Sequence, residues 1–267
     1  MPTMFPPESD DAGDSVTGWK QIRLIRTFLI LLVPCLVLSF ISGALYLALT
    51  RSTPETFNDI HFWFYFFDVG REINVPTWYT SVMWVVAGLV AGYFARKAVR
   101  FRLSWGLFAF VCVLFSLDEM LELHERLDVI GVELSKYLPF DLHFVWVIPG
   151  VIIAAVFVLL LLRMVLSLPA GVRNGLILAG IVFVSGAVGA ESLSGLVLAS
   201  YEEAPPIFFA VTLLEETLEM SGVSLCLSSL LHLLEHRATD GGTAYRMAAR
   251  KRRTTSEPHS FADVTGA

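Results

Sequence analysis

Nine ionisable residues lie within, or at the end of, three apolar stretches of this sequence. In chain order they are Asp118, Glu119, Glu122, His124, Glu125, Glu191, Glu215, Glu216 and Glu219. A charge at the centre of a membrane costs from about 3 to more than 10 kcal/mol, so acids kept there usually serve a function. The set therefore predicts chemistry that involves protons or cations.

A helical projection places most of these acids on shared faces. At about 100° per residue, one unbroken helix puts the acids from Asp118 to Glu125 within an arc of about 120°, with His124 outside it. The acids from Glu215 to Glu219 fill the same arc on a second helix. Gly222 and Cys226 continue that second face with small residues, which allow helices to approach closely.

The acids are also expected to lie at similar depths in a membrane. Counted from the outer ends of the expected helices, Glu215 lies about nine residues in, Glu191 about eight and Asp118 about five to seven, and nine residues span about 14 Å. Three helices would then bring carboxyl groups to one layer in the outer half of the membrane.

Facing carboxyl groups in a low-dielectric medium must share protons or bind cations. We predict a divalent metal site in this layer, with Asp118 and Glu119 as the candidate catalytic bases. Oxygen ligands favour Mg, Ca or Mn, whereas zinc usually needs more His or Cys. A ferritin-like di-iron site is weakly supported because the Glu-x-x-His pattern is missing. The predicted ligands are Glu122, His124, Glu125, Glu191, Glu215, Glu216 and Glu219.

Two simpler interpretations of the acids stay open. The third apolar stretch could leave the membrane near Asp118, which would make DEMLELHERLD a solvated amphipathic end. Glu191, Glu215 and Glu216 have apolar sequence on both sides and have no such exit. Their alternative role is a structural knot of hydrogen bonds between three helices.

An aromatic segment, HFWFYFF at 61–67, precedes the second apolar stretch. We expect it to lie at the membrane interface or to pack back onto the bundle. The residues after it could simply start a helix, with Asn74 as its cap and Pro76 in its first turn. The functional alternative is a lid over the acids, formed by His61, Asp68 or Glu72.

Composition predicts an all-α, polytopic transmembrane bundle. Of the 267 residues, 55% are hydrophobic and 16% are charged. Six apolar runs are long enough to cross a bilayer, at roughly 27–50, 77–95, 103–123, 144–163, 175–199 and 206–234. We divide the chain into a disordered leader (1–18), a six-helix transmembrane domain (19–236) and a basic cytoplasmic tail (237–267).

The basic residues favour one side of this predicted bundle. Fifteen of the 19 Lys and Arg residues fall on the side that holds both termini, which the positive-inside rule assigns to the cytoplasm. The basic tail is expected to bind anionic lipid headgroups. No nucleic-acid partner is expected, because no folded module accompanies the basic run. Cys35, Cys112 and Cys226 are expected to act as small apolar residues.

A short internal repeat links the two richest acidic motifs. LDEMLEL (117–123) aligns with LEETLEM (214–220), and the two helices should run in opposite directions. An acidic motif at the end of each half is what a 3+3 inverted repeat would give. A chance match in Leu- and Glu-rich sequence is the alternative.

Three motifs together resemble a group of uncharacterised bacterial multi-pass membrane proteins. They are E-x-N-x-P-T-W (72–78), L-D-E-x(4)-H-E (117–125) and E-E-x-x-E-M-x-G (215–222), and the resemblance covers about 55–236. It implies a bacterial inner-membrane setting and no particular reaction. Alkaline ceramidase-type hydrolases also combine intramembrane acids with His, but they use several His as zinc ligands. Here only His124 lies near the layer, unless His61 or His143 folds in.

Three functions remain as hypotheses. The first is a metal-binding membrane protein, potentially an enzyme acting on a lipid-linked or periplasm-facing substrate. The second is a proton- or cation-coupled transporter that uses the same carboxyl groups. The small number of spans, and the lack of a Gly- or Pro-broken helix near the acids, argue against it. The third is a non-catalytic scaffold of a membrane complex. Assembly into a homo-oligomer is a further open hypothesis.

Overall fold

The computed structural model describes residues 18–139, 142–201, 204–239 and 242–248. Most of the predicted leader and residues 249–267 of the predicted tail lie outside these ranges. The helices are α1 (Leu24–Thr50), α2 (Phe57–Phe67), α3 (Val75–Lys97), α4 (Arg102–Leu121), α5 (Asp128–Ser135), α6 (Val147–Ser167), α7 (Ala170–Val184), α8 (Glu191–Ser200) and α9 (Pro206–His232). A 3₁₀ turn, Glu125–Leu127, precedes α5, and a π-helical segment, Ser185–Ala190, joins α7 to α8.

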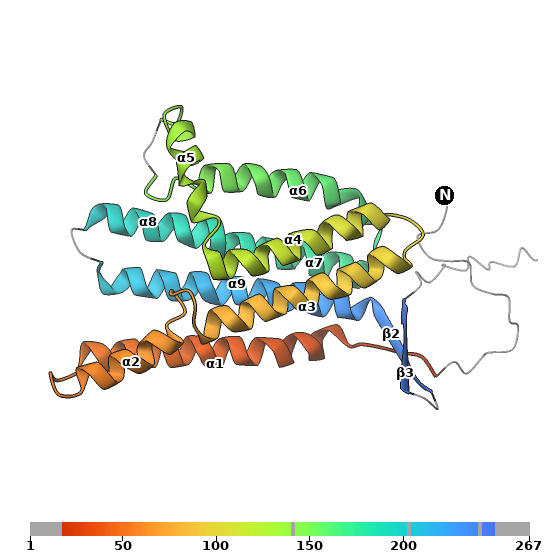
Figure 1. The fold of residues 1–267 in the computed structure, drawn as a ribbon, viewed down its shortest axis with the longest axis horizontal. Coiled ribbons are helices and arrows are strands. Elements are labelled where there is room, and N and C mark those ends of the chain that lie inside the picture. Colours follow the sequence, from red (N-terminus) through yellow and green to blue (C-terminus); the bar gives the residue numbers. More distant parts are fainter. Residues whose placement is uncertain (1–17, 140–141, 202–203, 240–241, 249–267) are drawn as a thin grey trace, which may run out of the picture.

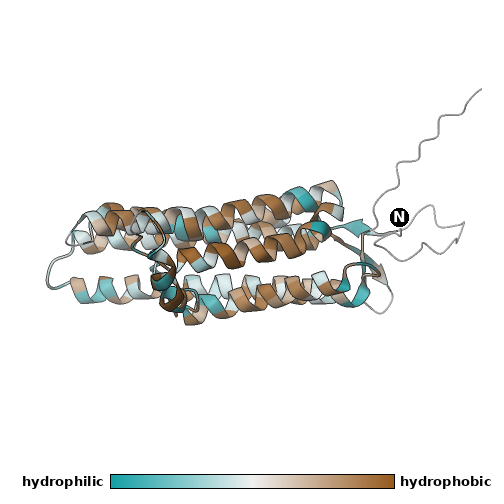
Figure 2. Ribbon diagram, turned by 90° about the horizontal axis from the view of Figure 1, so that it is seen from above, coloured by the Kyte–Doolittle hydropathy of each residue, from teal (hydrophilic) through white to brown (hydrophobic). Residues whose placement is uncertain are grey.

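Five helical segments are long and apolar enough to cross a membrane: α1, α3, α4, α6 and the continuous stretch from α7 to α8. They lie side by side along the long axis of the molecule (Figure 1), with hydrophobic residues along most of their length (Figure 2). The helical architecture predicted from composition is therefore confirmed, and these five segments of the described chain are candidate membrane spans. Helix α9 has 27 residues but carries three glutamates near its middle, and it is not among the five.

Helix α9 is the packing centre of the bundle, in contact with α1, α3, α7 and α8. Small residues make this possible because they let two backbones approach. A Cβ atom on Gly222 would come within 2.8 Å of the Phe183 backbone nitrogen on α7. The hydroxyl of Ser39 on α1 and that of Thr217 on α9 are 2.7 Å apart. Cys35, Cys112 and Cys226 are buried free thiols, as expected.

A small sheet closes one end of the bundle. Its antiparallel order is β1 (Lys20–Gln21), β2 (Leu234–Thr239) and β3 (Gly242–Met247). Trp19 stacks under Arg237 and Arg246, with its ring centroid 5.1 and 4.5 Å from their guanidinium carbons. This sheet was not predicted: β2 and β3 form a hairpin within the predicted polar tail, and β1 joins it from the other end of the chain.

Basic residues gather at this sheet end, where α1 begins and α9 ends (Figure 1). The opposite end, with α2 and α5, carries four basic residues among those that the structure describes: Arg51, Arg71, Arg126 and Lys136. The long helices run alternately away from the sheet end and back toward it (Figure 1). The basic residues are shared unequally between the two ends, as the sequence predicted.

Candidate functional site

Helix α4 stops three residues after Asp118. Leu121 is its last residue, and Glu122 adopts a left-handed conformation with φ 50°. The prediction that Glu122 and Glu125 share a helix face with Asp118 was therefore wrong, because α4 ends before it reaches them. Asp118 instead holds the turn that follows. Its Oδ1 accepts the His124 backbone N–H at 2.7 Å, and its Oδ2 lies 3.0 Å from His124 Nδ1.

A polar chain leads from His124 into the bundle. The His124 ring lies 4.6 Å from the Trp146 ring, centroid to centroid, just before α6. Trp146 donates its indole N–H to Glu191 Oε1 at 3.0 Å. The side chain of Glu191, at the start of α8, interacts in turn with that of Glu215 on α9. The sequence predicted neither the contacts of Trp146 with His124 and Glu191 nor the hydrogen bonds between His124 and Asp118.

The π-helical segment Ser185–Ala190, with sequence SGAVGA, sits where Glu191 meets α9. A Cβ atom on Gly186 would lie 2.8 Å from the Glu215 carbonyl oxygen and 2.8 Å from Glu219 Cγ. The helix runs without a break from Ala170 to Ser200, but its geometry changes near the acids, which the sequence did not predict. Glycine allows this close approach, and π-helical turns are frequent at functional sites.

Carboxyl groups from several elements lie near this π-helical segment. The carboxyl of Glu216 is surrounded by the charges of Glu119, Glu72, Glu191 and Asp68. That of Glu219 faces Glu216, Glu119, Glu215 and Glu191. Glu215 is buried, with 7% of its surface exposed. We define the carboxyl cluster as Asp68, Glu72, Asp118, Glu119, Glu191, Glu215, Glu216 and Glu219.

Trp84 on α3 borders the cluster at Glu119, and the two side chains interact. Trp84 is buried, with 5% of its surface exposed. A buried indole N–H usually finds an acceptor, and the Glu119 carboxyl is the acceptor that interacts with it here.

The loop between α2 and α3 covers the cluster from the α2 side. Glu72 lies near the charges of Glu122, His124, Asp118 and Glu125. Its Oε2 is buried without a partner in the described structure. Of the three residues predicted as a lid, Asp68 and Glu72 thus lie beside the acids. His61 does not: it is exposed on α2 and stacks on Phe57 with ring centroids 5.6 Å apart.

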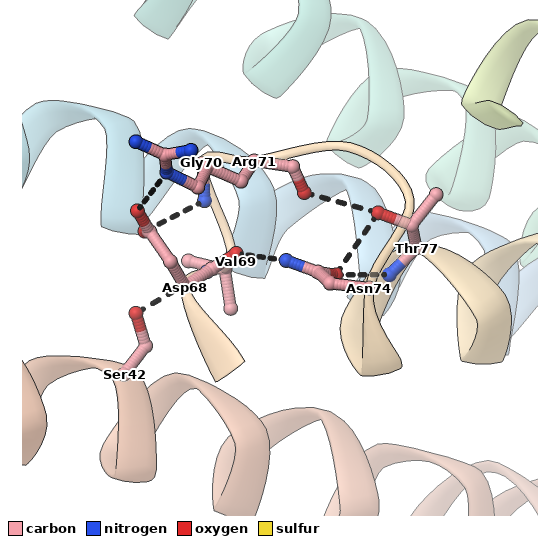
Figure 3. Close-up of polar contacts among 7 residues, drawn as sticks. All are labelled: Ser42, Asp68, Val69, Gly70, Arg71, Asn74 and Thr77. Carbon is pink, nitrogen blue, oxygen red and sulfur yellow. Dashed lines mark hydrogen bonds and ion pairs between the residues drawn. The ribbon is translucent and has the colours of Figure 1, made fainter. Parts of the chain in front are cut away.

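The same loop is fixed by hydrogen bonds to its own backbone (Figure 3). Asn74 donates to the Asp68 carbonyl at 2.6 Å and accepts the Thr77 backbone N–H at 3.2 Å. The predicted cap by Asn74, with Pro76 in the first turn of α3, is confirmed. Ile73, with φ 60°, is strained, since branched side chains disfavour the left-handed region.

Glu122 and Glu125 lie at the outer rim of the cluster, near His124. Burial raises the pKa of Glu125, the charge of Glu122 raises it further, and His124 partly offsets both. Burial lowers the pKa of His124, but its hydrogen bond to Asp118 and the surrounding carboxylates more than compensate, so the pKa is raised.

We expect the stabilising effect of His124 to depend on pH. A raised pKa means that its charged interaction with Asp118 is fully present below the unfolded value of 6.5 and is lost as pH rises through the folded value. Thermal unfolding of wild type and His124→Gln in detergent should show the larger difference at pH 5.5. An equal difference at pH 5.5 and pH 9 would contradict this expectation.

A metal site needs several ligand atoms that converge on one point. Within the described residues, no group of three or more His, Cys, Asp or Glu side chains is placed to hold a metal ion. The carboxyl groups of Glu191 and Glu215 interact with each other, and neighbouring buried carboxyl groups are suited to bind protons or cations.

The comparisons with known proteins give a family. A family described as Domain of unknown function (DUF8692) matches residues 28–233. The chain belongs to this family. The match runs from α1 to the end of α9 and includes every member of the carboxyl cluster, while β1 to β3 fall outside it. No curated protein and no solved structure matches the chain.

Proposed function

We propose that this DUF8692 protein is a proton- or cation-coupled transporter of the bacterial inner membrane. Six spans would cross the bilayer, with the sheet end and both termini in the cytoplasm. The gathering of basic residues at the sheet end supports this orientation through the positive-inside rule. The same charges would contact anionic lipid headgroups.

Helix α9 serves as the sixth span in this proposal. Its 27 residues extend about 40 Å, which is enough to cross a bilayer. Its three glutamates are turned toward other carboxyl groups rather than toward lipid. Shared protons or a bound cation would lower the cost of keeping them there.

The observation that carries the proposal is the gathering of Glu191, Glu215 and Glu219 at one level of the bundle, where the π-helical segment packs on α9 and Trp146 donates to Glu191. Neighbouring carboxyl groups in a low-dielectric interior can take up and release protons in steps. The adjacent π-helical segment, Ser185–Ala190, is a local irregularity of the kind that lines binding sites in transporters.

The internal repeat supports the same function. In the alignment of LDEMLEL with LEETLEM, Glu119 is equivalent to Glu216. These two residues act on each other in the cluster, one from α4 and the other from the antiparallel α9. Equivalent residues that meet at the centre are what two inverted halves related by a two-fold axis would give.

A divalent metal is the second candidate ligand. The buried, unpartnered Glu72 Oε2 favours it, because that oxygen lacks a donor. Glu122, Glu191, Glu215 and Glu219 would be the ligands, and oxygen donors suit Mg, Ca or Mn. A metal would add Lewis-acid chemistry toward a lipid-linked or periplasm-facing substrate. Its occupancy requires these side chains to move closer together.

Proton uptake by the purified full chain in proteoliposomes tests the proposal. An imposed pH gradient, followed with an internal pH-sensitive dye, should drive uptake that Glu216→Gln and Glu215→Gln abolish. Glu133→Gln is the matched control, because Glu133 is exposed on α5 and contacts Lys136. Infrared difference spectra at neutral pH should show a protonated carboxyl band that Glu215→Gln removes.

Elemental analysis of the same preparations separates the alternatives. Stoichiometric metal that is lost in both Glu215→Gln and Glu122→Gln, without proton uptake by wild type, would establish a metal centre and overturn the transporter. Neither metal nor proton uptake, in folded protein, would leave a scaffold and would overturn it equally.

A further inference from the structure

Helix α2 runs back along α1 instead of lying across the end of the bundle (Figure 1). The two helices are in contact and are joined by the turn after Thr50. We infer that residues 57–74 form a re-entrant segment. It would enter the membrane from the α2 side, turn at the loop 68–74 and place that loop over the carboxyl cluster.

Contacts along the segment show that it runs from the outer end of α1 toward the middle of the bundle. Phe64 on α2 packs against Tyr46 and Phe209, with ring centroids 6.2 and 6.0 Å apart. Further on, the Val69 backbone N–H donates to Ser42 Oγ at 3.2 Å. Tyr46 and Ser42 lie about 6 and 12 Å before the end of α1, at 1.5 Å per residue.

Helix α9 gives an independent measure of the same descent. Phe209 lies about 4.5 Å, and Thr212 about 9 Å, from the start of α9. A Cβ atom on Gly70 would come within 2.6 Å of Thr212 Cγ2, so the loop packs directly on α9 at this level. Both neighbouring helices therefore place the loop well below their outer ends.

The residues of α2 change along this path as a re-entrant segment requires. Asn58, Asp59 and His61 lie in its first half, near the outer end of α1. The second half is aromatic from Phe62 to Phe67. Phe62, Trp63, Tyr65 and Phe66 keep between 41% and 55% of their surface exposed, which suits contact with hydrocarbon.

Backbone polar groups in the loop have internal partners (Figure 3). Besides the Ser42 and Asn74 bonds, the Gly70 N–H donates to Asp68 Oδ1 at 3.2 Å, and Thr77 Oγ1 donates to the Arg71 carbonyl at 3.1 Å. Irregular backbone survives at membrane depth only where protein satisfies it or water lines it. The N–H groups from Asp68 to Arg71 and the carbonyls of Asp68 and Arg71 meet that condition.

Arg71 then closes the outer entrance to the cluster. Its Nε lies 3.6 Å from Asp68 Oδ2, and its guanidinium carbon lies 5.1 Å from the centroid of the Tyr65 ring. The Arg71 side chain is half exposed, whereas that of Asp68 is 12% exposed and acts on Glu216. The ion pair between Arg71 and Asp68 thus separates the outside from the deeper acids.

Spin labels test the depth of the segment in liposomes. The labels would be placed singly at Phe66→Cys and Asn58→Cys, and the three native cysteines are buried, which keeps background labelling low. Phe66→Cys should be reached by oxygen and shielded from a water-soluble nickel relaxant, unlike Asn58→Cys. Equal access of the nickel complex to both sites would show a surface helix and overturn the inference.

A cross-link tests the contact at the tip. Ser42→Cys with Val69→Cys should form a disulfide under mild oxidation, while the control pair Ser42→Cys with Glu55→Cys should not. Failure to cross-link, together with rapid labelling of Val69→Cys by a membrane-impermeant maleimide, would also overturn the inference. These tests need no transport activity, so their failure is distinct from failure of the proposed function.

The closure by Arg71 rests on the proposed function. Arg71→Gln and Asp68→Asn should each speed proton uptake from the outer side, relative to wild type. Unchanged uptake in both variants, with the depth and the cross-link as expected, would overturn the closure and leave the re-entrant segment intact.

Discussion

Replacing Glu216 by methionine should raise the thermal stability of the protein and abolish proton uptake. The largest charges acting on Glu216 are those of acids on α4, on the loop before α3 and on α8. A buried polar group without a compensating hydrogen bond costs about 1–3 kcal/mol, and an apolar side chain of similar size removes that cost. The melting temperature in detergent, measured beside proton uptake in liposomes, gives both results.

The opposite outcome would favour the structural knot. If hydrogen bonds from the acids hold the helices together, Glu216→Met should unfold at a lower temperature than wild type. Glu133→Met is the control for the general effect of methionine, because Glu133 is 70% exposed in its side chain. A gain in stability with loss of activity is the pattern of a site kept for function.

Adding one methyl group at Gly186 should destabilise the bundle. The new Cβ would lie 2.8 Å from the Glu215 carbonyl oxygen and 2.8 Å from Glu219 Cγ, so α9 and the π-helical segment would have to separate. Overpacking of this kind costs about 1–3 kcal/mol. Gly186→Ala should therefore lower the unfolding midpoint, and it should shift the carboxyl bands of the cluster in infrared difference spectra.

The matched control lies in the same π-helical segment. A Cβ atom on Gly189 would meet nothing within 4 Å, so Gly189→Ala should leave stability unchanged or slightly improved. Equal destabilisation by the two alanines would mean that the glycines matter for backbone conformation alone. The close approach of Gly186 to α9 would then not be what limits substitution there.

Much of the helical architecture could be predicted from the sequence, because a helix that crosses a bilayer needs about 20 consecutive apolar residues. The start of α3 could also be predicted, since Asn74 and Pro76 act through local hydrogen bonding and φ preference. The acids on α9 were placed on one face because that helix is unbroken through Glu215, Glu216 and Glu219.

Other features depend on contacts that one sequence does not reveal. Helix α4 ends at Leu121, although Glu122 and its neighbours are good helix formers, because Asp118 binds the backbone of His124. The π-helical segment arises where Gly186 packs on α9, more than 25 residues along the chain. The descent of α2 depends on Ser42 and Thr212, which are small polar residues without a local signal.

The short sheet has a mechanical consequence for the whole bundle. Strand β1 leads into α1, strand β2 follows α9, and the pairing of Lys20 with His236 fastens the first helix to the last. Gln21 adds a 2.8 Å hydrogen bond to the His232 carbonyl at the end of α9. If α1 separates from α9, the two helices must therefore rotate about the sheet end. The largest displacement then falls at the opposite end of the bundle, where Phe64 and Phe209 are in contact.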